Sequence, residues 1–247
     1  MEGYEESTYG DLIAPVYDDL YGEMEDVEPV TTWLAKRAGA GPALELAVGT
    51  GRVALPLSER GVEVHGIDVS EAMLAKLKSK PGADAVKIVV GDFSEVRAPR
   101  DLYSLVYVVF NTFFALVTQE SQLRCFSNVA TRLAPGGAFV IEAFVPDPSR
   151  FANNRRLSTD RVKLDTVWLE SSVHDPVTQQ ITTQQIALTQ ERIHLFPSHL
   201  RYAWPSELDL MARLAGLRLA ERWGGWEREP FTASSMKHIS VYEPAPR

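Results

Sequence analysis

The chain has 247 residues, of which 45% are hydrophobic, and it carries a formal net charge of -8. A chain of this size buries about 70–75% of its unfolded surface, so one α/β domain with an elaboration needs no metal or disulfide to fold. Residues 1–30 contain ten acids and no lysine or arginine, and the rest of the chain is close to neutral. The sequence has no basic stripe of the kind that nucleic-acid binding requires. The longest strongly apolar run, 105–110, is far short of the ~20 residues of a membrane span.

Residues 1–40 form the first predicted unit, a helical lid rich in acidic side chains. Within it, Tyr17 and Tyr21 are four residues apart and share one helix face, so both can point at one ligand or pack on the core. Tyr9 lies upstream and is a further lid candidate. The acids form either a solvated helix face or a cap that attracts a cationic molecule. The start of the chain lacks the basic and apolar regions of a signal peptide, so we expect a cytoplasmic protein.

The next unit, residues 41–146, begins with a strand that runs into a glycine-rich turn. The predicted strand 44–47 contains Glu45 and is followed by Gly49 and Gly51, which let the backbone turn sharply and approach a ligand closely. Asp68 follows about 20 residues later at the end of the next strand, where a carboxylate can accept hydrogen bonds from both ribose hydroxyls. This spacing predicts a pocket for an adenosine-bearing cofactor.

The same turn also satisfies the loose dinucleotide pattern, so a nicotinamide-dependent oxidoreductase is an alternative. The stretch GTGRVA matches G-x-G-x-x-G/A. Glu45 argues against this alternative, because a dinucleotide places its pyrophosphate near the helix N-terminus, where a carboxylate would repel it. A ligand with an ammonium and a sulfonium group would instead favour a nearby acid.

The remaining elements of this unit alternate between strands and helices, which is typical of a mostly parallel sheet with crossover helices. Cys125 is expected on the buried face of a helix. Because it is the only cysteine of the sequence, the chain cannot form an internal disulfide, which is typical of proteins in a reducing compartment. The predicted elements are helix 52–60, strand 62–67, helix 71–79 capped by Ser70, strand 87–90, the doubly apolar strand 105–109, helix 121–133 and strand 138–144.

After Pro146 the sequence pattern changes to that of antiparallel strands. The alternation extends over 161–204, which is too long for a plain connection, so residues 147–204 are expected to form an inserted antiparallel sheet. Residues 205–247 then return the chain to the main sheet, with a predicted helix at 207–215 and strands near 217–223 and 236–242.

These motifs together resemble the class I S-adenosylmethionine-dependent methyltransferases, of the small-molecule, natural-product type. The family pattern consists of the acid Glu45, the glycine turn, the acid Asp68, a Gly-Asp pair at Gly91-Asp92 and a fifth-strand hairpin that is similar to 132–144. One departure is Ala47, which stands where many members have the first glycine. The resemblance implies a seven-stranded, mostly parallel, Rossmann-like sheet with helices on both faces, plus an inserted antiparallel β-sheet near the C-terminal part.

The resemblance also implies S-adenosyl-L-methionine as the cofactor and assigns residues to it. Asp68 would hold the ribose, Val69 and Phe93 would flank the adenine, Asp92 would accept the adenine amine, and Glu45 would lie near the amino group of the methionine moiety. A tyrosine of the N-terminal helix would close over the cofactor carboxylate. The full cofactor set comprises Tyr17, Tyr21, Glu45, Ala47, Gly49, Gly51, Arg52, Asp68, Val69, Met73, Asp92, Phe93 and Phe110.

Candidates for the acceptor site follow the fourth strand, where ligands of open α/β sheets lie, and also fall in the inserted sheet. Asn111 offers a donor and an acceptor in one group, and no histidine has a partner that the sequence reveals. No Asp/Asn cluster indicates a metal site. The acceptor candidates are Tyr9, Asn111, Phe113, Phe114, Tyr202 and Trp204, with Ile193 and Phe196 as further possible walls, and the candidates for catalysis are Tyr9, Tyr17 and Asn111.

We therefore expect a methyltransferase that acts on the nitrogen of a small natural product or amino sugar. A desolvated pocket favours the unprotonated amine that such a reaction needs, whereas a hydroxyl acceptor, which is the alternative, usually requires a base. The rivals of another class are the NAD-dependent oxidoreductase and a regulator that binds the cofactor without chemistry. We expect no nucleic-acid or membrane partner, and a homo-oligomer is possible.

Overall fold

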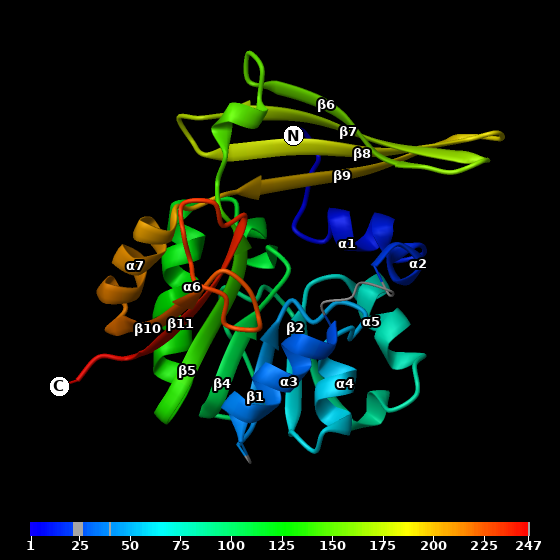
Figure 1. Ribbon diagram of the computed structural model, residues 1–247. Helices are drawn as coiled ribbons and strands as arrows, with labels where there is room; N and C mark the ends of the chain where they lie inside the picture. The colour runs from blue at the N-terminus through cyan, green and yellow to red at the C-terminus, as the bar shows by residue number, and fades with distance from the viewer. Residues whose placement is uncertain (22–26, 40, 247) are drawn as a thin grey trace.

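The larger of two β-sheets forms the body of the protein in this computed structural model, which describes residues 1–21, 27–39 and 41–246 (Figure 1). Within these residues the sheet has seven strands, in the order β10-β11-β5-β4-β1-β2-β3. Strands β3, β2, β1, β4 and β5 run parallel, while β11 is antiparallel to both β5 and β10. The strands are β1 (Ala43–Leu46), β2 (Val64–Asp68), β3 (Val86–Val90), β4 (Tyr103–Val108), β5 (Leu133–Phe144), β10 (Leu217–Trp223) and β11 (Lys237–Pro244).

Helices cover both faces of this sheet because its central strands carry apolar side chains on both sides. One face packs against α3, α4 and α5, and the opposite face packs against α6 and α7. Cys125 of α6 is fully buried, as predicted. The helices are α1 (Thr8–Ile13), α2 (Tyr17–Tyr21), α3 (Val27–Ala38), α4 (Ala54–Glu59), α5 (Glu71–Lys78), α6 (Gln119–Arg132) and α7 (Pro205–Leu214), with short 3-10 turns η1 (Ala83–Ala85), η2 (Thr112–Ala115) and η3 (Pro148–Arg150).

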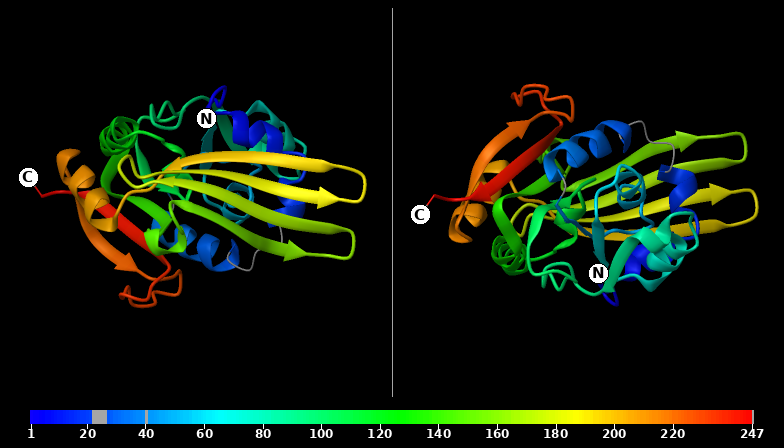
Figure 2. Two further views of the ribbon diagram at one scale, coloured as in Figure 1. Left: turned by 90° about the horizontal axis from the view of Figure 1, so that it is seen from above. Right: turned by 90° about the horizontal axis from the view of Figure 1, so that it is seen from below.

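A second sheet, inserted between β5 and α7, lies across the carboxyl ends of the large sheet's parallel strands (Figures 1 and 2). Its four antiparallel strands are β6 (Arg155–Val162), β7 (Thr166–Asp175), β8 (Gln180–Thr189) and β9 (Ile193–Arg201). Helices α1 and α2 lie beneath it, where Ile13 and Ala14 pack with Ala187 and Phe196 of the sheet and with Met73 of α5. The expected fold class is thus confirmed.

The strand and helix boundaries differ from the sequence-based ones chiefly at two places. Strand β5 begins at Leu133 instead of 138, because the Pro135-Gly136-Gly137 segment forms a bulge, visible as a register shift from Tyr103↔Leu133 to Leu105↔Ala138. The first strand of the inserted sheet begins at Arg155, inside the predicted insertion 147–204 and ahead of residue 161, where the sequence alternation begins. The predicted division into four units stays a prediction, and residues 22–26 and 40 of the lid lie outside the described residues.

A buried polar network joins the small sheet to the helices of the large one. Arg201, at the end of β9 and 6% exposed, donates to Gln122 of α6 (2.6 Å), to Gln179 (3.0 Å) and to Glu207 of α7 (2.7 Å). Gln122 in turn donates to the carbonyl of Arg201 (2.8 Å). Because Arg201 and Gln122 are buried and Glu207 is only partly exposed, the network fixes the small sheet in one position over the large sheet.

We expect Arg201→Met to lower the free energy of unfolding by about 3 kcal/mol, because it leaves the Glu207 carboxylate and the Gln122 amide without their buried partner. Urea denaturation measures this loss. Arg218→Met is the matched control: it removes a surface ion pair with Glu243 and should cost less than ~1 kcal/mol. Equal losses in the two variants would contradict the structural role of Arg201.

Candidate functional site

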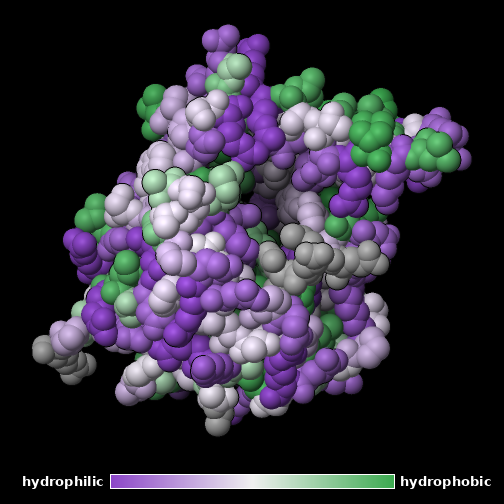
Figure 3. All heavy atoms as spheres, in the orientation of Figure 1, coloured by the Kyte–Doolittle hydropathy of each residue, from purple (hydrophilic) through white to green (hydrophobic). Residues whose placement is uncertain are grey.

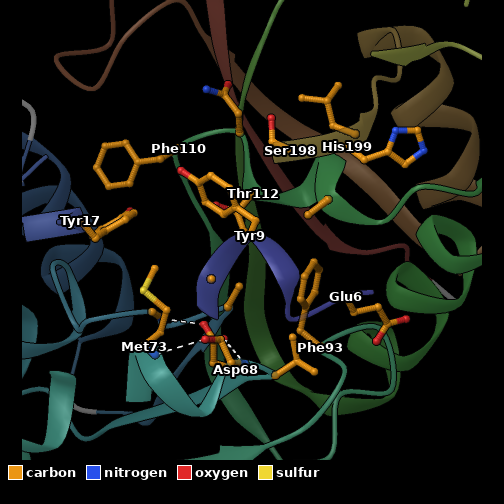
Figure 4. A pocket seen from close by; sticks show the side chains of 18 of the residues that line it. Glu6, Tyr9, Tyr17, Asp68, Met73, Phe93, Phe110, Thr112, Ser198 and His199 are labelled. Atoms are coloured by element: carbon orange, nitrogen blue, oxygen red, sulfur yellow. Dashed lines mark hydrogen bonds between the residues drawn. The ribbon is translucent and has the colours of Figure 1, made fainter. Parts of the chain in front are cut away.

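A cavity of about 680 Å³ lies between the carboxyl edge of the large sheet and the small sheet (Figures 3 and 4). The loops after β1, β2 and β4 form its floor, the inner face of the small sheet forms its roof, and the N-terminal segment closes one side. The cavity lies at the carboxyl ends of the parallel strands, where ligands of open α/β sheets bind. The cavity is therefore the candidate functional site.

The loop after β1 takes the sharp turn that its glycines predict. Gly49 and Gly51 have φ angles of +55° and +78°, in the left-handed region. A Cβ atom on Gly51 would lie 2.9 Å from Cγ of Leu77, so the close packing of α5 also requires glycine there. Ala47 has φ +57° as well. The loop thus keeps the left-handed turn without a glycine at this position, at a cost of roughly 1–2 kcal/mol.

Asp68, at the end of β2, ties this loop to the neighbouring strand. Its Oδ2 accepts a hydrogen bond from the Gly49 amide (2.7 Å), and its Oδ1 accepts one from the Ser70 amide (2.8 Å). Burial raises the pKa of Asp68, although these backbone hydrogen bonds oppose the rise. The carboxylate lines the cavity, and each oxygen keeps a further acceptor site for a ligand hydroxyl.

Glu45 brings a second buried carboxyl group to the same cavity. It lies in the middle of β1, is 4% exposed and accepts a hydrogen bond from the Tyr107 hydroxyl (3.1 Å). Burial raises the pKa of Glu45 to about 8. A buried acid of this kind is ionised most readily when a cation comes close to it.

Arg52 and two aromatic rings, of Tyr17 and Phe110, form the wall on the side of α2. The Arg52 guanidinium lies 3.6 Å from the centre of the Phe110 ring and 6.0 Å from that of Tyr17. Arg52 also donates to the carbonyl of Tyr21 (3.2 Å), whose ring lies 4.9 Å from that of Tyr17. Tyr17 lines the cavity, whereas Tyr21 does not and instead reaches Gln185 of the roof.

The end of β4 contains two consecutive non-glycine residues in the left-handed region, Phe110 (φ +55°) and Asn111 (φ +68°). Glu142 of β5 holds both: its side chain accepts from the Phe110 amide (3.0 Å), and its carbonyl accepts from the Asn111 amide (3.2 Å). Asn111 Oδ1 accepts from the Phe144 amide (2.6 Å), and Lys237 pairs with Glu142 (3.1 Å). Glu142 is not among the residues predicted from the sequence, where its only signal is a lone acid within the apolar strand AFVIEAF.

The third acid of the predicted set faces a different way. Asp92 accepts from the amide and hydroxyl of Ser94 (2.7 and 2.5 Å) and lies 3.4 Å from Arg124. It lines a separate cavity of about 220 Å³ instead of the large one. Its contact with adenine stays a prediction. Of the predicted cofactor residues, those that line the large cavity are Tyr17, Glu45, Ala47, Gly49, Arg52, Asp68, Val69, Met73, Phe93 and Phe110.

The acceptor candidates divide into residues that line the cavity and residues that do not. Tyr9 and Asn111 line it. Phe113 and Phe114 do not, because the chain turns inward through η2 and buries both rings fully, against Phe126 and Phe144 respectively. The expectation that these two rings form acceptor walls is therefore corrected.

The two aromatic candidates at the end of the small sheet also lie away from the cavity. Tyr202 is 4% exposed, and its hydroxyl is bonded to His174 Nε2 (3.0 Å) within the core. Trp204 precedes α7 and is 41% exposed to solvent. Of the further walls, Ile193 is exposed and Phe196 packs against Trp168. None of these four residues lines the cavity, so the expectation that they form its walls is corrected. Tyr202 and Trp204 lie beyond the end of β9, whereas Phe196 is on the inner face of the small sheet but packs on α1.

Several cavity residues were not identified from the sequence. They lie on the inner face of β7, β8 and β9, and in η2; they are Thr112, Glu170, Thr183, Gln185 and Ser198, and His199 lies beside them. The two-residue alternation of these strands was the available signal, but it does not reveal which face is turned inward. Burial lowers the pKa of His199, whose Nδ1 is 2.8 Å from Thr182 Oγ1.

Metal and membrane sites are not found in the described part of the chain. Its residues contain no group of histidine, cysteine and acidic side chains with metal-binding geometry. None of its helices combines the length and hydrophobicity of a membrane span.

Comparison with known proteins gives consistent matches. Residues 43–137 match the family model described as a methyltransferase domain. The structure of the CcbJ methyltransferase from Streptomyces caelestis is similar at 43% identity and a TM-score of 0.93, over 98% of this chain and 100% of that one. The cypemycin N-terminal methyltransferase of a Streptomyces species is 28% identical over 96% of this chain and 98% of its own length. The sugar N-methyltransferase KedS8 from Streptoalloteichus shares the fold, with 20% identity and a TM-score of 0.69 over 100% of this chain and 99% of that one.

The raised pKa of Glu45 predicts a specific pH dependence of stability. Because its folded pKa of about 8 exceeds the ordinary carboxyl value of 4.5, the folded protein binds the proton more tightly than the unfolded chain does. This stabilisation is complete below pH ~4.5, falls by at most ~1.4 kcal/mol per pH unit as pH rises, and is lost above pH ~8.

We expect Glu45→Gln, which retains the bond from Tyr107, to become more stable than the parent protein as pH rises from 5 to 8. Urea denaturation at several pH values gives the difference in free energy of unfolding. The exposed Glu59 of α4 provides the control variant Glu59→Gln, for which the difference should stay constant. A constant difference for Glu45→Gln as well would contradict the assigned shift.

Proposed function

Because the chain belongs to the class I S-adenosylmethionine-dependent methyltransferases, we propose that it transfers the methyl group to the amine nitrogen of a small natural-product molecule such as an amino sugar. The chain is an enzyme, and its cofactor is S-adenosylmethionine. The nicotinamide-dependent oxidoreductase and the regulator without chemistry are thereby excluded.

The residues of the cavity floor fit this cofactor. The left-handed glycine turn leaves room beside the backbone, and Asp68 offers acceptor sites to ribose hydroxyls. Val69 and Phe93 provide apolar walls for a base, and the buried Glu45 suits an ammonium group. When bound, the cofactor supplies an electrophilic methyl group on a sulfonium centre. The protein's task is to align the acceptor with it at about 3–3.5 Å and to exclude water.

The charge of the cavity lining is the observation that carries the proposal of an amine acceptor. Among the described residues, the lining contains five acids and a single lysine or arginine side chain, Arg52. Two of these acids, Glu45 and Asp68, fit the cofactor, which leaves Glu5, Glu6 and Glu170 for the acceptor. Such a lining attracts cationic molecules and raises their local concentration. Inside the cavity, desolvation favours the neutral amine that acts as the nucleophile.

Two relatives support nitrogen as the methylated atom. The cypemycin enzyme is named as an N-terminal methyltransferase, and KedS8, at lower identity, as a sugar N-methyltransferase. A hydroxyl acceptor is the second candidate, because His199 borders the cavity and its lowered pKa makes it a neutral group that can take a proton.

The direct test uses purified enzyme, S-adenosylmethionine and matched acceptors. The panel contains methyl glycosides of 2-, 3- and 4-aminodeoxyglucose, their N-acetyl derivatives, methyl glucoside, and a short peptide with a free N-terminus. We expect a mass gain of one methyl group on at least one aminodeoxy sugar, located on nitrogen by NMR, and no reaction of its N-acetyl derivative. Methylation of oxygen in the same sugars would favour the second candidate, and methylation of the peptide alone would contradict a sugar-like acceptor.

The acidic N-terminal segment generates a further prediction, because Glu5 and Glu6 line the cavity; Figure 4 labels Glu6. For a cationic acceptor, the double variant Glu5→Gln/Glu6→Gln should raise the Michaelis constant severalfold at low ionic strength. At 0.5 M salt the difference should vanish, because screening acts within a few ångströms there. Glu2→Gln, outside the lining, is the control. An unchanged Michaelis constant at every salt concentration would assign these acids to a solvated surface only.

A further inference from the structure

Polar side chains occupy the part of the small sheet that faces the cavity. At one end of the inner face, Trp168, Ala187 and Phe196 pack on α1 and α2. Further along, Glu170 is paired with Gln185 across the sheet, and Thr183 with Ser198. Apolar residues would be expected here if the roof only covered the floor, because polar groups removed from water are unfavourable without partners. The roof therefore has the chemistry of a binding surface for a polar molecule.

One carboxylate oxygen of Glu170 is hydrogen-bonded within the protein, and the other is available to a ligand. Arg156 Nη1 (3.0 Å) and Ser172 Oγ (3.3 Å) both donate to its Oε1. Within the described residues, no group donates to Oε2, although a carboxylate oxygen accepts two hydrogen bonds. Glu170 lines the cavity and Arg156 does not. The ion pair thus holds the carboxylate in one orientation and leaves an acceptor oxygen for a ligand.

Two hydroxyl groups complete this arrangement from opposite sides of the cavity. Thr112 lies on the floor in η2, and Ser198 lies on the roof in β9 (Figure 4). Neither hydroxyl forms a hydrogen bond with another described residue, and both residues line the cavity. Hydroxyl groups of this kind donate to and accept from the hydroxyls of a polyol.

We propose that Glu170 is the acceptor-binding carboxylate and that the acceptor is an amine that carries hydroxyl groups. Glu170 Oε2 accepts a hydrogen bond from the acceptor amine, which leaves the nitrogen lone pair directed away from the carboxylate, and Thr112 and Ser198 bind acceptor hydroxyls. This inference rests on the proposed N-methyl transfer and adds to it the specificity-determining residue and the polyhydroxylated character of the substrate.

The test compares Glu170→Gln with the parent enzyme on the best aminodeoxy sugar of the panel. We expect the acceptor Michaelis constant to rise at least tenfold, because a charge-assisted hydrogen bond is lost. The dissociation constant of S-adenosylhomocysteine, measured by calorimetry, should stay within twofold. Glu170→Asp should recover part of the loss. Glu191→Gln, at an exposed turn of the same sheet, is the matched control and should change neither constant.

Acceptor analogues provide the complementary test. The parent enzyme should prefer the aminodeoxy sugars over cyclohexylamine by at least tenfold in kcat/KM. Thr112→Val and Ser198→Ala should each reduce that preference by raising the Michaelis constant for the sugars and not for cyclohexylamine.

The outcomes separate the two proposals. Methylation of oxygen by the parent enzyme would overturn the proposed function. Three results, each with nitrogen still methylated, would overturn this inference alone. They are an unchanged acceptor Michaelis constant in Glu170→Gln, a loss of S-adenosylhomocysteine affinity in that variant as large as the rise in its acceptor Michaelis constant, and no preference of the parent enzyme for aminodeoxy sugars over cyclohexylamine.

Discussion

Two buried carboxylates hold the backbone at the carboxyl edge of the large sheet, and the site depends on the turns that they fix. Asp68 accepts from the Gly49 amide and so pins the loop after β1 against β2. Glu142 accepts from the Phe110 amide and so pins the end of β4 against β5. Both turns contain left-handed residues, which a free chain avoids. The hydrogen bonds to charged acceptors offset that cost and give the cavity floor a defined shape before a ligand arrives.

The floor and the roof of the cavity present different chemical groups. The floor combines glycine turns, apolar walls and the acid Glu45, which suit a nucleoside with a cationic tail. The roof presents Glu170 and hydroxyl groups, which suit a polar acceptor. Because the two surfaces come from separate sheets, each can be specific for a different molecule, while the Arg201 network keeps the distance between them constant.

The sequence allowed accurate prediction of features that depend on local pattern. Strand and helix periods, the glycine turn and the Ser70 cap were sufficient for the order of the elements and for most of the cofactor cavity. The direction of individual side chains was harder to predict from the sequence, because it depends on contacts between residues that are far apart in the chain. Phe113 and Phe114 follow β4 as ligand residues often do, yet the left-handed Phe110-Asn111 pair turns them into the core. Glu170 was missed because a strand's alternation does not reveal which face meets a partner.

The small sheet is inserted between β5 and α7, so the roof is one continuous stretch of sequence, 155–201. A roof from a related enzyme can therefore be transplanted as a single cassette while the floor remains intact. The cassette must keep Gln179, in the turn between β7 and β8, and Arg201, at its end, because these residues donate hydrogen bonds to Glu207 and Gln122 outside the cassette. Acceptor choice in this architecture is thus an exchangeable property, open to engineering by recombination of whole segments.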